Sequence, residues 1–177
     1  QSSSRGLGDV YKRQHLGAVF GQKFGWERAN WFAPKTIEQI DDWSFRRSNW
    51  FDHVGNECLN VQNNVGILDM TAFAKCRISG PGAENFLDSL VANKLPQKNG
   101  RVNLCHALNT KGGVHSEFTI AKETDDSFYL VSAGAFQRLD HDWIKKWMPN
   151  DRSVTFENLT NSIGAVSYTH LTLPTTR

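Results

Sequence analysis

The sequence has only three cysteines, and their placement argues against a metal site or a catalytic thiol. Cys58, Cys76 and Cys105 lie far apart and among apolar residues, and no pair of them has the Cys-x-x-Cys spacing. The histidines also lack the spacing of metal ligands. We therefore expect no metal, and we predict three reduced, buried thiols in a reducing compartment.

Both ends of the chain lack an apolar period that continues into the neighbouring residues. They resemble one translated sequencing-adapter DNA read in opposite directions. The codons GAT GTG TAT AAG AGA CAG encode residues 9–14, and the reverse complement of that DNA, in another frame, encodes residues 166–171. We therefore predict that residues 1–14 and 166–177 are adapter-like artefacts, and we expect them to be loose. The alternative is a pair of natural polar tails.

Residues 15–165 remain, which is 151 residues and enough for one domain with a sizeable core. They do not begin with methionine and they stop within a pattern, so we expect an internal part of a longer protein. No apolar run approaches the roughly 20 residues needed to span a bilayer.

Strong charge of either sign is also missing. The whole chain has 20 basic and 18 acidic residues, for a net charge of +2, but without its ends 16 basic and 17 acidic residues remain, for a net charge of −1. This balance calls for no nucleic-acid partner and no anionic membrane.

Glycines and aromatic residues are frequent in residues 15–35. Their Gly-x3-Gly-x3-Gly spacing differs from the Gly-x-Gly-x-x-Gly fingerprint of a dinucleotide site. We predict an ordered loop here, followed by a polar linker over residues 36–42.

The remainder of the chain mixes helical and strand patterns. Apolar residues at three- and four-residue steps predict helices over residues 45–64, 83–93 and 136–147. Runs of β-prone residues predict strands over residues 65–71, 74–79, 102–109, 114–122, 127–132 and 153–159. Turns at residues 111–113 and 123–126 indicate an antiparallel meander. The predicted fold class is α+β, with a largely antiparallel sheet packed with helices.

Glu117 is the first candidate for chemistry, because it lies on a β-prone run just after the tight turn at Gly112 and Gly113. A carboxylate in a partly apolar pocket can hold an N–H group and move a proton. The alternative is an exposed strand glutamate. We expect His115 to share the strand face of Glu117 as a hydrogen-bonding histidine. Asp69 is the second acid, with an expected structural role in a buried turn.

Two further sets of residues have a functional and a structural interpretation. Tyr129 and Phe73 could stack on a flat ring, although aromatic residues in such runs are usually part of a core. Arg46 and Arg47 could hold an anionic tail, although a solvated basic pair is the simpler interpretation.

Five segments together resemble the folate-binding module of the glycine-cleavage aminomethyltransferase family. These segments are residues 25–32, 45–57, 66–75, 107–120 and 127–132. Residues 25–32 (GWERANWF) are the most discriminating, because they resemble the fused, FAD-dependent dimethylglycine and sarcosine dehydrogenases and have no counterpart in the stand-alone transferase. The resemblance implies that residues 15–43 end the central region of such a dehydrogenase, and that residues 44–165 are the N-terminal part of an incomplete folate-binding domain.

The resemblance also implies a chemistry. A domain that is absent from this chain uses FAD to oxidise an N-methylated amine, and the folate module transfers the one-carbon unit to tetrahydrofolate. Glu117 matches the acid that contacts the folate and assists proton transfer, where many members have aspartate. Four residues match the walls of the folate site: Phe73, Leu104, Tyr129 and Val131. The rest of the site is expected beyond residue 165, so we expect this chain alone to be inactive.

Two other functions agree with the same residues. One is a stand-alone folate-dependent aminomethyl- or methyltransferase, and the other is a folate-binding module without catalysis. The partners implied in each case are small molecules, together with the missing parts of the same polypeptide. The implied location is the cytoplasm in a bacterium or the mitochondrial matrix in a eukaryote.

Overall fold

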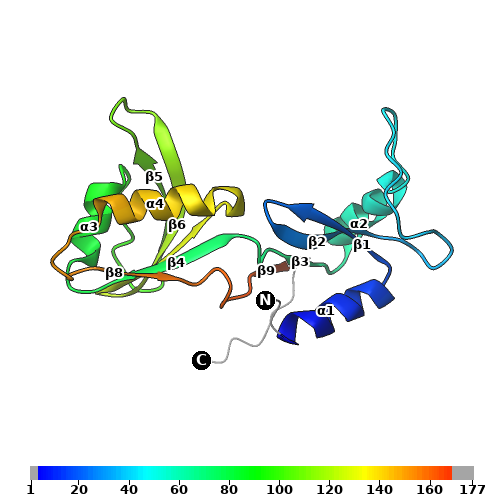
Figure 1. The fold of residues 1–177 in the computed structure, drawn as a ribbon, viewed down its shortest axis with the longest axis horizontal. Coiled ribbons are helices and arrows are strands. Elements are labelled where there is room, and N and C mark those ends of the chain that lie inside the picture. Colours follow the sequence, from blue (N-terminus) through cyan, green and yellow to red (C-terminus); the bar gives the residue numbers. More distant parts are fainter. Residues whose placement is uncertain (1–3, 169–177) are drawn as a thin grey trace. The chain divides into compact units, whose positions relative to one another are not determined.

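The computed structural model describes residues 4–168, and Figure 1 shows the order of its elements. The chain forms two compact units, which divide after Leu68 and after Val166. The sequence places a boundary between residues 43 and 44 instead. That position is not a division between units, because Trp50 and Val54 pack against the buried Trp31.

The first helix, α1 (Ser4–His15), lies in the segment that resembles adapter DNA. Its last turn carries Lys12, Arg13 and His15, and positive side chains favour the C-terminal end of a helix. The expectation of a loose N-terminal end is therefore wrong from residue 4 onward. A translated adapter can form a helix as any other sequence can, so its origin stays a prediction.

A β-hairpin follows α1, where the sequence predicts an ordered loop. Strands β1 (Ala18–Lys23) and β2 (Trp26–Phe32) pair antiparallel, with Lys23 opposite Trp26. Phe24 and Gly25 join the strands with φ angles of 55° and 83°. Two successive positive φ angles are the signature of a two-residue hairpin turn whose twist matches that of the strands. The loop prediction is wrong because the glycines were interpreted as irregular structure and not as a turn.

Helix α2 (Phe51–Asn63) is shorter than predicted and buries none of its residues. The predicted inward face is largely wrong, because Phe51, Cys58 and Val61 are exposed, whereas Val54 packs against the small core around Trp31. Residues 44–50 stay outside the helix. The hydroxyl groups of Ser44 and Ser48 bind backbone N–H groups there, in competition with helical hydrogen bonds.

The second unit contains a five-stranded antiparallel sheet with the order β5-β6-β7-β4-β8. Its strands are β4 (Ala74–Ser79), β5 (Val102–Leu108), β6 (Val114–Thr124), β7 (Ser127–Ser132) and β8 (Thr155–Asn158). The predicted meander is confirmed as β5-β6-β7. A separate two-stranded sheet pairs β3 (Ile67–Asp69) with β9 (Val166–Tyr168).

Two helices cover one face of the large sheet. Helix α3 (Ala83–Leu90) contributes Phe86, Leu87 and Leu90 to the core, and α4 (Gln137–Trp147) contributes Ile144. Figure 1 shows α4, in yellow to orange, lying along the sheet after a short 3₁₀ turn, η1 (Gly134–Phe136). The predicted α+β class, with helices packed on an antiparallel sheet, is confirmed.

The buried face of α4 differs from its predicted face. Leu139 and Trp147 are exposed, whereas Asp140 and His141 are buried. The hydroxyl of Ser132 on β7 donates a 2.6 Å hydrogen bond to the Asp140 carboxylate, which turns this side of the helix toward the sheet. None of the helices that the structure describes is long and apolar enough to cross a membrane.

Candidate functional site

The predicted site residues on β5, β6 and β7 share one face of the five-stranded sheet. Side chains alternate between the faces of a strand, and Cys105, Phe118 and Leu130 point into the core beneath α3 and α4. The intervening residues point to the opposite face, which we call the outer face. It carries Leu104 of β5, Glu117 of β6, and Tyr129 and Val131 of β7.

The register of the strands arranges the outer face in rows. Glu117 pairs with His106, and the next row runs from Leu104 through Thr119 to Val131. Adjacent rows lie about 7 Å apart along a strand, so the structure brings Leu104 and Val131 close to Glu117. Tyr129 pairs with Ala121, four residues or about 13 Å along β6 from Glu117.

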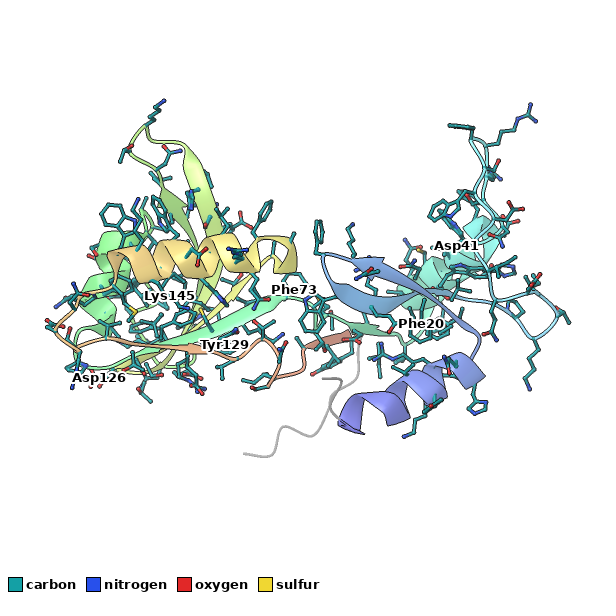
Figure 2. The ribbon with its side chains drawn as sticks, in the orientation of Figure 1. Phe20, Asp41, Phe73, Asp126, Tyr129 and Lys145 are labelled. Atoms are coloured by element: carbon teal, nitrogen blue, oxygen red, sulfur yellow. The ribbon has the colours of Figure 1, made fainter. Side chains whose placement is uncertain are left out.

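Phe73 directly precedes β4 and is half-buried (Figure 2). Extending the observed register by one pair would place residue 73 opposite residue 133, and residue 133 opposite Glu117. This extension would put Phe73 at the far end of the row that begins with His106 and Glu117. With about 4.8 Å between neighbouring strands, the two backbones are about 10 Å apart.

The carboxylate of Glu117 faces solvent and contacts a histidine that the sequence did not single out. The Glu117 side chain is 60% exposed, and its Oε2 lies 3.1 Å from Nε2 of His106. His106 in turn lies against Asn93, whose Oδ1 is 2.7 Å from the His106 backbone nitrogen and 3.1 Å from Nδ1. The register of the β5-β6 hairpin places these two residues opposite each other, and the sequence alone did not determine that register.

His115 does not share the face of Glu117, so that expectation is wrong. The pairing shifts between Ala107 opposite Ser116 and Leu108 opposite Val114, which leaves His115 in a β-bulge. Its ring stacks on Trp143 of α4, with 3.9 Å between the ring centroids. The bulge turns His115 to the helix side of the sheet and leaves His106 as the partner of Glu117.

A hollow of about 430 Å³ opens at the Tyr129 end of the outer face. Its lining consists of Gly100, Ala121, Lys122, Glu123, Tyr129 and Ile163. Neither Glu117 nor Phe73 borders it. The acid and the hollow therefore lie at separate places along β6, although Tyr129 belongs to both the predicted site and the hollow.

An ion-pair network fixes the sheet beside this hollow. The Arg77 guanidinium holds Glu123 through two hydrogen bonds of 2.7 and 3.0 Å and holds Glu157 through a third of 3.0 Å. Hydrogen bonds from Arg77 lower the pKa of Glu123. Burial, together with the charge of Glu123, raises the pKa of Tyr129 and keeps its phenol protonated at neutral pH. Tyr129 can therefore act as a neutral wall and a hydrogen-bond donor.

The family is decided by a match to the model of the GCVT N-terminal domain over residues 10–168. The chain belongs to the GCVT N-terminal domain family. The match includes residues 10–14 and 166–168, which the sequence assigned to adapter-like ends.

Known proteins of two kinds resemble this GCVT domain. It is 32% identical over 158 residues to the mitochondrial dimethylglycine dehydrogenase of Mus musculus, a match that covers 89% of this chain and 18% of the relative. It is 30% identical over 149 residues to the mitochondrial pyruvate dehydrogenase phosphatase regulatory subunit of the same species, covering 81% of this chain and 17% of that protein. The chain therefore spans less than a fifth of the length of either relative.

A solved structure confirms the fold of this GCVT domain. The crystal structure of glycine cleavage system aminomethyltransferase T from Bartonella henselae matches with a TM-score of 0.66 and 19% sequence identity. The match covers 85% of this chain and 37% of the other. The predicted resemblance to the aminomethyltransferase fold is confirmed.

The outer face of this GCVT domain combines a carboxylate with aliphatic side chains. Leu104 is 52% exposed and, with the half-buried Val131, offers an apolar surface next to the Glu117 carboxylate. A carboxylate accepts hydrogen bonds from N–H groups, and aliphatic side chains pack on ring faces. This face thus presents a hydrogen-bond acceptor beside apolar side chains.

The remaining sequence predictions concern residues away from this face. Asp69 is exposed and not buried, and its Oδ1 accepts a hydrogen bond from the Thr71 backbone, which makes a local turn. Cys76 and Cys105 are buried as predicted, but Cys58 is exposed on α2. Arg46 lies in the exposed segment before α2, and Arg47 lies 4.4 Å from the ring of Phe51. No group of three or more potential metal ligands gathers among the residues that the structure describes.

Proposed function

We propose that this chain carries part of the folate site of an FAD-dependent N-methyl amine dehydrogenase, of the dimethylglycine or sarcosine type, and that Glu117 is the catalytic residue of that part. One observation carries the proposal. In a GCVT domain that is 32% identical to a dimethylglycine dehydrogenase, one exposed sheet face presents a carboxylate beside Leu104 and Val131.

The residues have separate roles in this proposal. Leu104 and Val131 hold the ring of tetrahydrofolate, and Phe73 and Tyr129 extend the wall at either end of the face. Glu117 accepts an N–H hydrogen bond and holds or moves a proton at its carboxylate oxygens. Tetrahydrofolate, when bound, supplies the nucleophilic nitrogen that receives the one-carbon unit. Holding it in place raises its effective concentration near the electrophile.

FAD belongs to another part of the polypeptide in this proposal. The matched relative is more than five times as long as its matched segment, which leaves room for a flavin domain and for the rest of the folate site. The named relatives are mitochondrial, and a bacterial form would place the same chemistry in the cytoplasm. The chain of 177 residues is proposed to be inactive by itself.

Glu117→Gln in the full-length protein tests the proposal. We expect flavin reduction by the amine to stay unchanged, because it takes place in another domain. Transfer of the methylene group to tetrahydrofolate should fall by about 100-fold or more, the usual contribution of a positioned acid–base group. Stopped-flow absorbance of the flavin and a coupled assay of methylenetetrahydrofolate measure the two steps separately.

Glu27→Gln is the matched control, because Glu27 is also an exposed glutamate on a strand. It should leave both steps unchanged. Methylene transfer at the wild-type rate in Glu117→Gln would refute the catalytic role of this acid.

A folate-binding module without catalysis is the second candidate. The similarity to a phosphatase regulatory subunit favours it, because that relative is named for regulation. In this case neither the wild type nor Glu117→Gln would turn over, and both would bind tetrahydrofolate in a titration. A stand-alone aminomethyl- or methyltransferase would instead transfer a one-carbon unit without any flavin signal.

A further inference from the structure

The backbone N–H of His106 fixes the orientation of the side-chain amide of Asn93. Asn93 lies in the segment that follows α3 along the edge of β5, where the Ala92 nitrogen donates to the His106 carbonyl oxygen. The backbone N–H of His106 donates to Oδ1 of Asn93 at 2.7 Å. A backbone N–H can only donate, so the side-chain oxygen of Asn93, and not its NH₂ group, faces His106.

The same amide oxygen decides which nitrogen of the His106 ring carries a proton. Nδ1 lies 3.1 Å from Oδ1 of Asn93, and an amide oxygen can only accept a hydrogen bond. Nδ1 must therefore be protonated. In a neutral imidazole the other nitrogen, Nε2, then has a lone pair and no hydrogen.

That lone pair points at another acceptor. Nε2 lies 3.1 Å from Oε2 of Glu117, and an ionised carboxylate only accepts hydrogen bonds. Nε2 of a neutral His106 is therefore placed to accept a proton that Glu117 carries.

We propose that Asn93, His106 and Glu117 form a proton relay, in which Asn93 keeps Nδ1 of His106 protonated and His106 positions Glu117 and stores the proton that Glu117 exchanges. This proposal rests on the proposed function of Glu117. A proton that arrives at Oε2 of Glu117 passes to Nε2. One O–H bond breaks and one N–H bond forms, His106 becomes an imidazolium, and Glu117 returns to its carboxylate form.

The groups that face the His106 ring agree with this relay. From β6 the ring is faced by the charged group of Glu117, and from residues 92–94 it is faced by the neutral amide of Asn93. His106 contacts Glu117 and acts through it in this proposal, so it is a positioning residue. Its ring is only partly covered, with 31% of the side chain exposed, so a stored proton can leave to solvent.

Nitrogen NMR of the histidine rings in this chain of 177 residues tests the relay without any catalysis. The ¹⁵N shift separates protonated from unprotonated ring nitrogens. We expect Nδ1 of His106 to carry a proton in the wild type. Glu117→Gln should change the ¹⁵N shift of Nε2, because it replaces the carboxylate that Nε2 faces. His53, which stacks on Trp31, is the internal control and should not change.

Asn93→Ala should release Nδ1 and allow the other tautomer to appear. A wild-type His106 that carries its neutral proton on Nε2, or an Nε2 shift that Glu117→Gln leaves unchanged, would overturn the relay. These outcomes leave the proposed function untouched, because they do not involve folate.

His106→Gln in the full-length protein distinguishes proton storage by His106 from a role in which His106 only positions Glu117. Glutamine can still donate a hydrogen bond to Glu117, but it cannot take up a proton. We expect the KM for tetrahydrofolate to stay within about 2-fold and kcat for methylene transfer to fall by at least about 10-fold. A wild-type kcat in His106→Gln would refute proton storage. If Glu117→Gln also kept full transfer, the proposed function itself would fail.

Discussion

Lys75 shows at the residue scale how a charged side chain is used inside this domain. It lies on β4 in the row of Leu104 and Val131, yet it is fully buried. Its Nζ donates hydrogen bonds of 2.6 and 2.8 Å to the backbone carbonyl oxygens of Thr71 and Phe73. Lys75 therefore fixes the turn that presents Phe73 at the end of the outer face.

Lys75→Met should destabilise the chain by about 1–3 kcal/mol, because methionine fills the space but leaves two partly buried carbonyl groups without their donor. Urea unfolding measures the change. Lys98→Met, at an exposed position, is the control and should stay within about 0.5 kcal/mol. Equal stability of Lys75→Met and wild type would show that the ammonium group does not hold the turn.

The cost of Lys75→Met should also depend on pH. Burial lowers the pKa of Lys75 from its usual 10.5, while the charge of Asp69 partly opposes this effect. Between the lowered pKa and 10.5 the unfolded chain binds more protons at this group, so the stability contributed by the lysine rises with pH. The stability difference between wild type and Lys75→Met should therefore widen in favour of the lysine as the pH increases through that window.

At the scale of elements, the turn from β7 into α4 depends on a close approach of two backbone segments. A Cβ on Gly134 would overlap the carbonyl oxygen of Ala72. The absence of a side chain at Gly134 thus lets η1 pack against the residues just before β4. The segment that carries Phe73 is held from both sides, by Lys75 and by this contact.

Gly134→Ala should lower the local stability of the second unit by about 1–3 kcal/mol, the usual cost of overpacking. Gly55→Ala should change stability in the opposite direction. Gly55 lies within α2 and has open space around it, so alanine should stabilise that helix by about 0.5–1 kcal/mol. Amide hydrogen exchange reads each unit separately. Unchanged protection of β4 and β7 in Gly134→Ala would contradict the packing described.

At the scale of the whole molecule, folding leaves one of the three cysteine thiols exposed and buries the other two. Cys58 is exposed on α2, whereas Cys76 and Cys105 lie in the core of the second unit. Burial raises the pKa of Cys76 to about 12, with a further contribution from the charge of Asp140, and burial raises the pKa of Cys105 as well. The two core thiols are therefore protonated at neutral pH and unreactive.

Ellman's reagent should react rapidly with one thiol in the native chain and with three in urea. Cys58→Ser should remove the rapid reaction and leave the slow ones unchanged. Rapid reaction of a second thiol in the native chain would show that the core around Cys76 or Cys105 is open.

The sequence by itself determined the fold class, the β5-β6-β7 meander and α3, because these depend on local periodicity and on turn residues between consecutive strands. It also indicated the family through ordered short motifs. It could propose Glu117, Leu104, Tyr129 and Val131 as site residues, and strand alternation alone places Tyr129 and Val131 on one face of β7. It could not place residues of different strands opposite one another.

Only the tertiary structure decided the partners of those residues. Cross-strand register made His106 the neighbour of Glu117, and a single bulge removed His115 from that face. The hydrogen bond from Ser132 to Asp140 set the buried side of α4 against its apolar pattern. A register, a bulge and a buried polar contact each join residues of different strands or helices, and the periodicity within a single element carries no information about them.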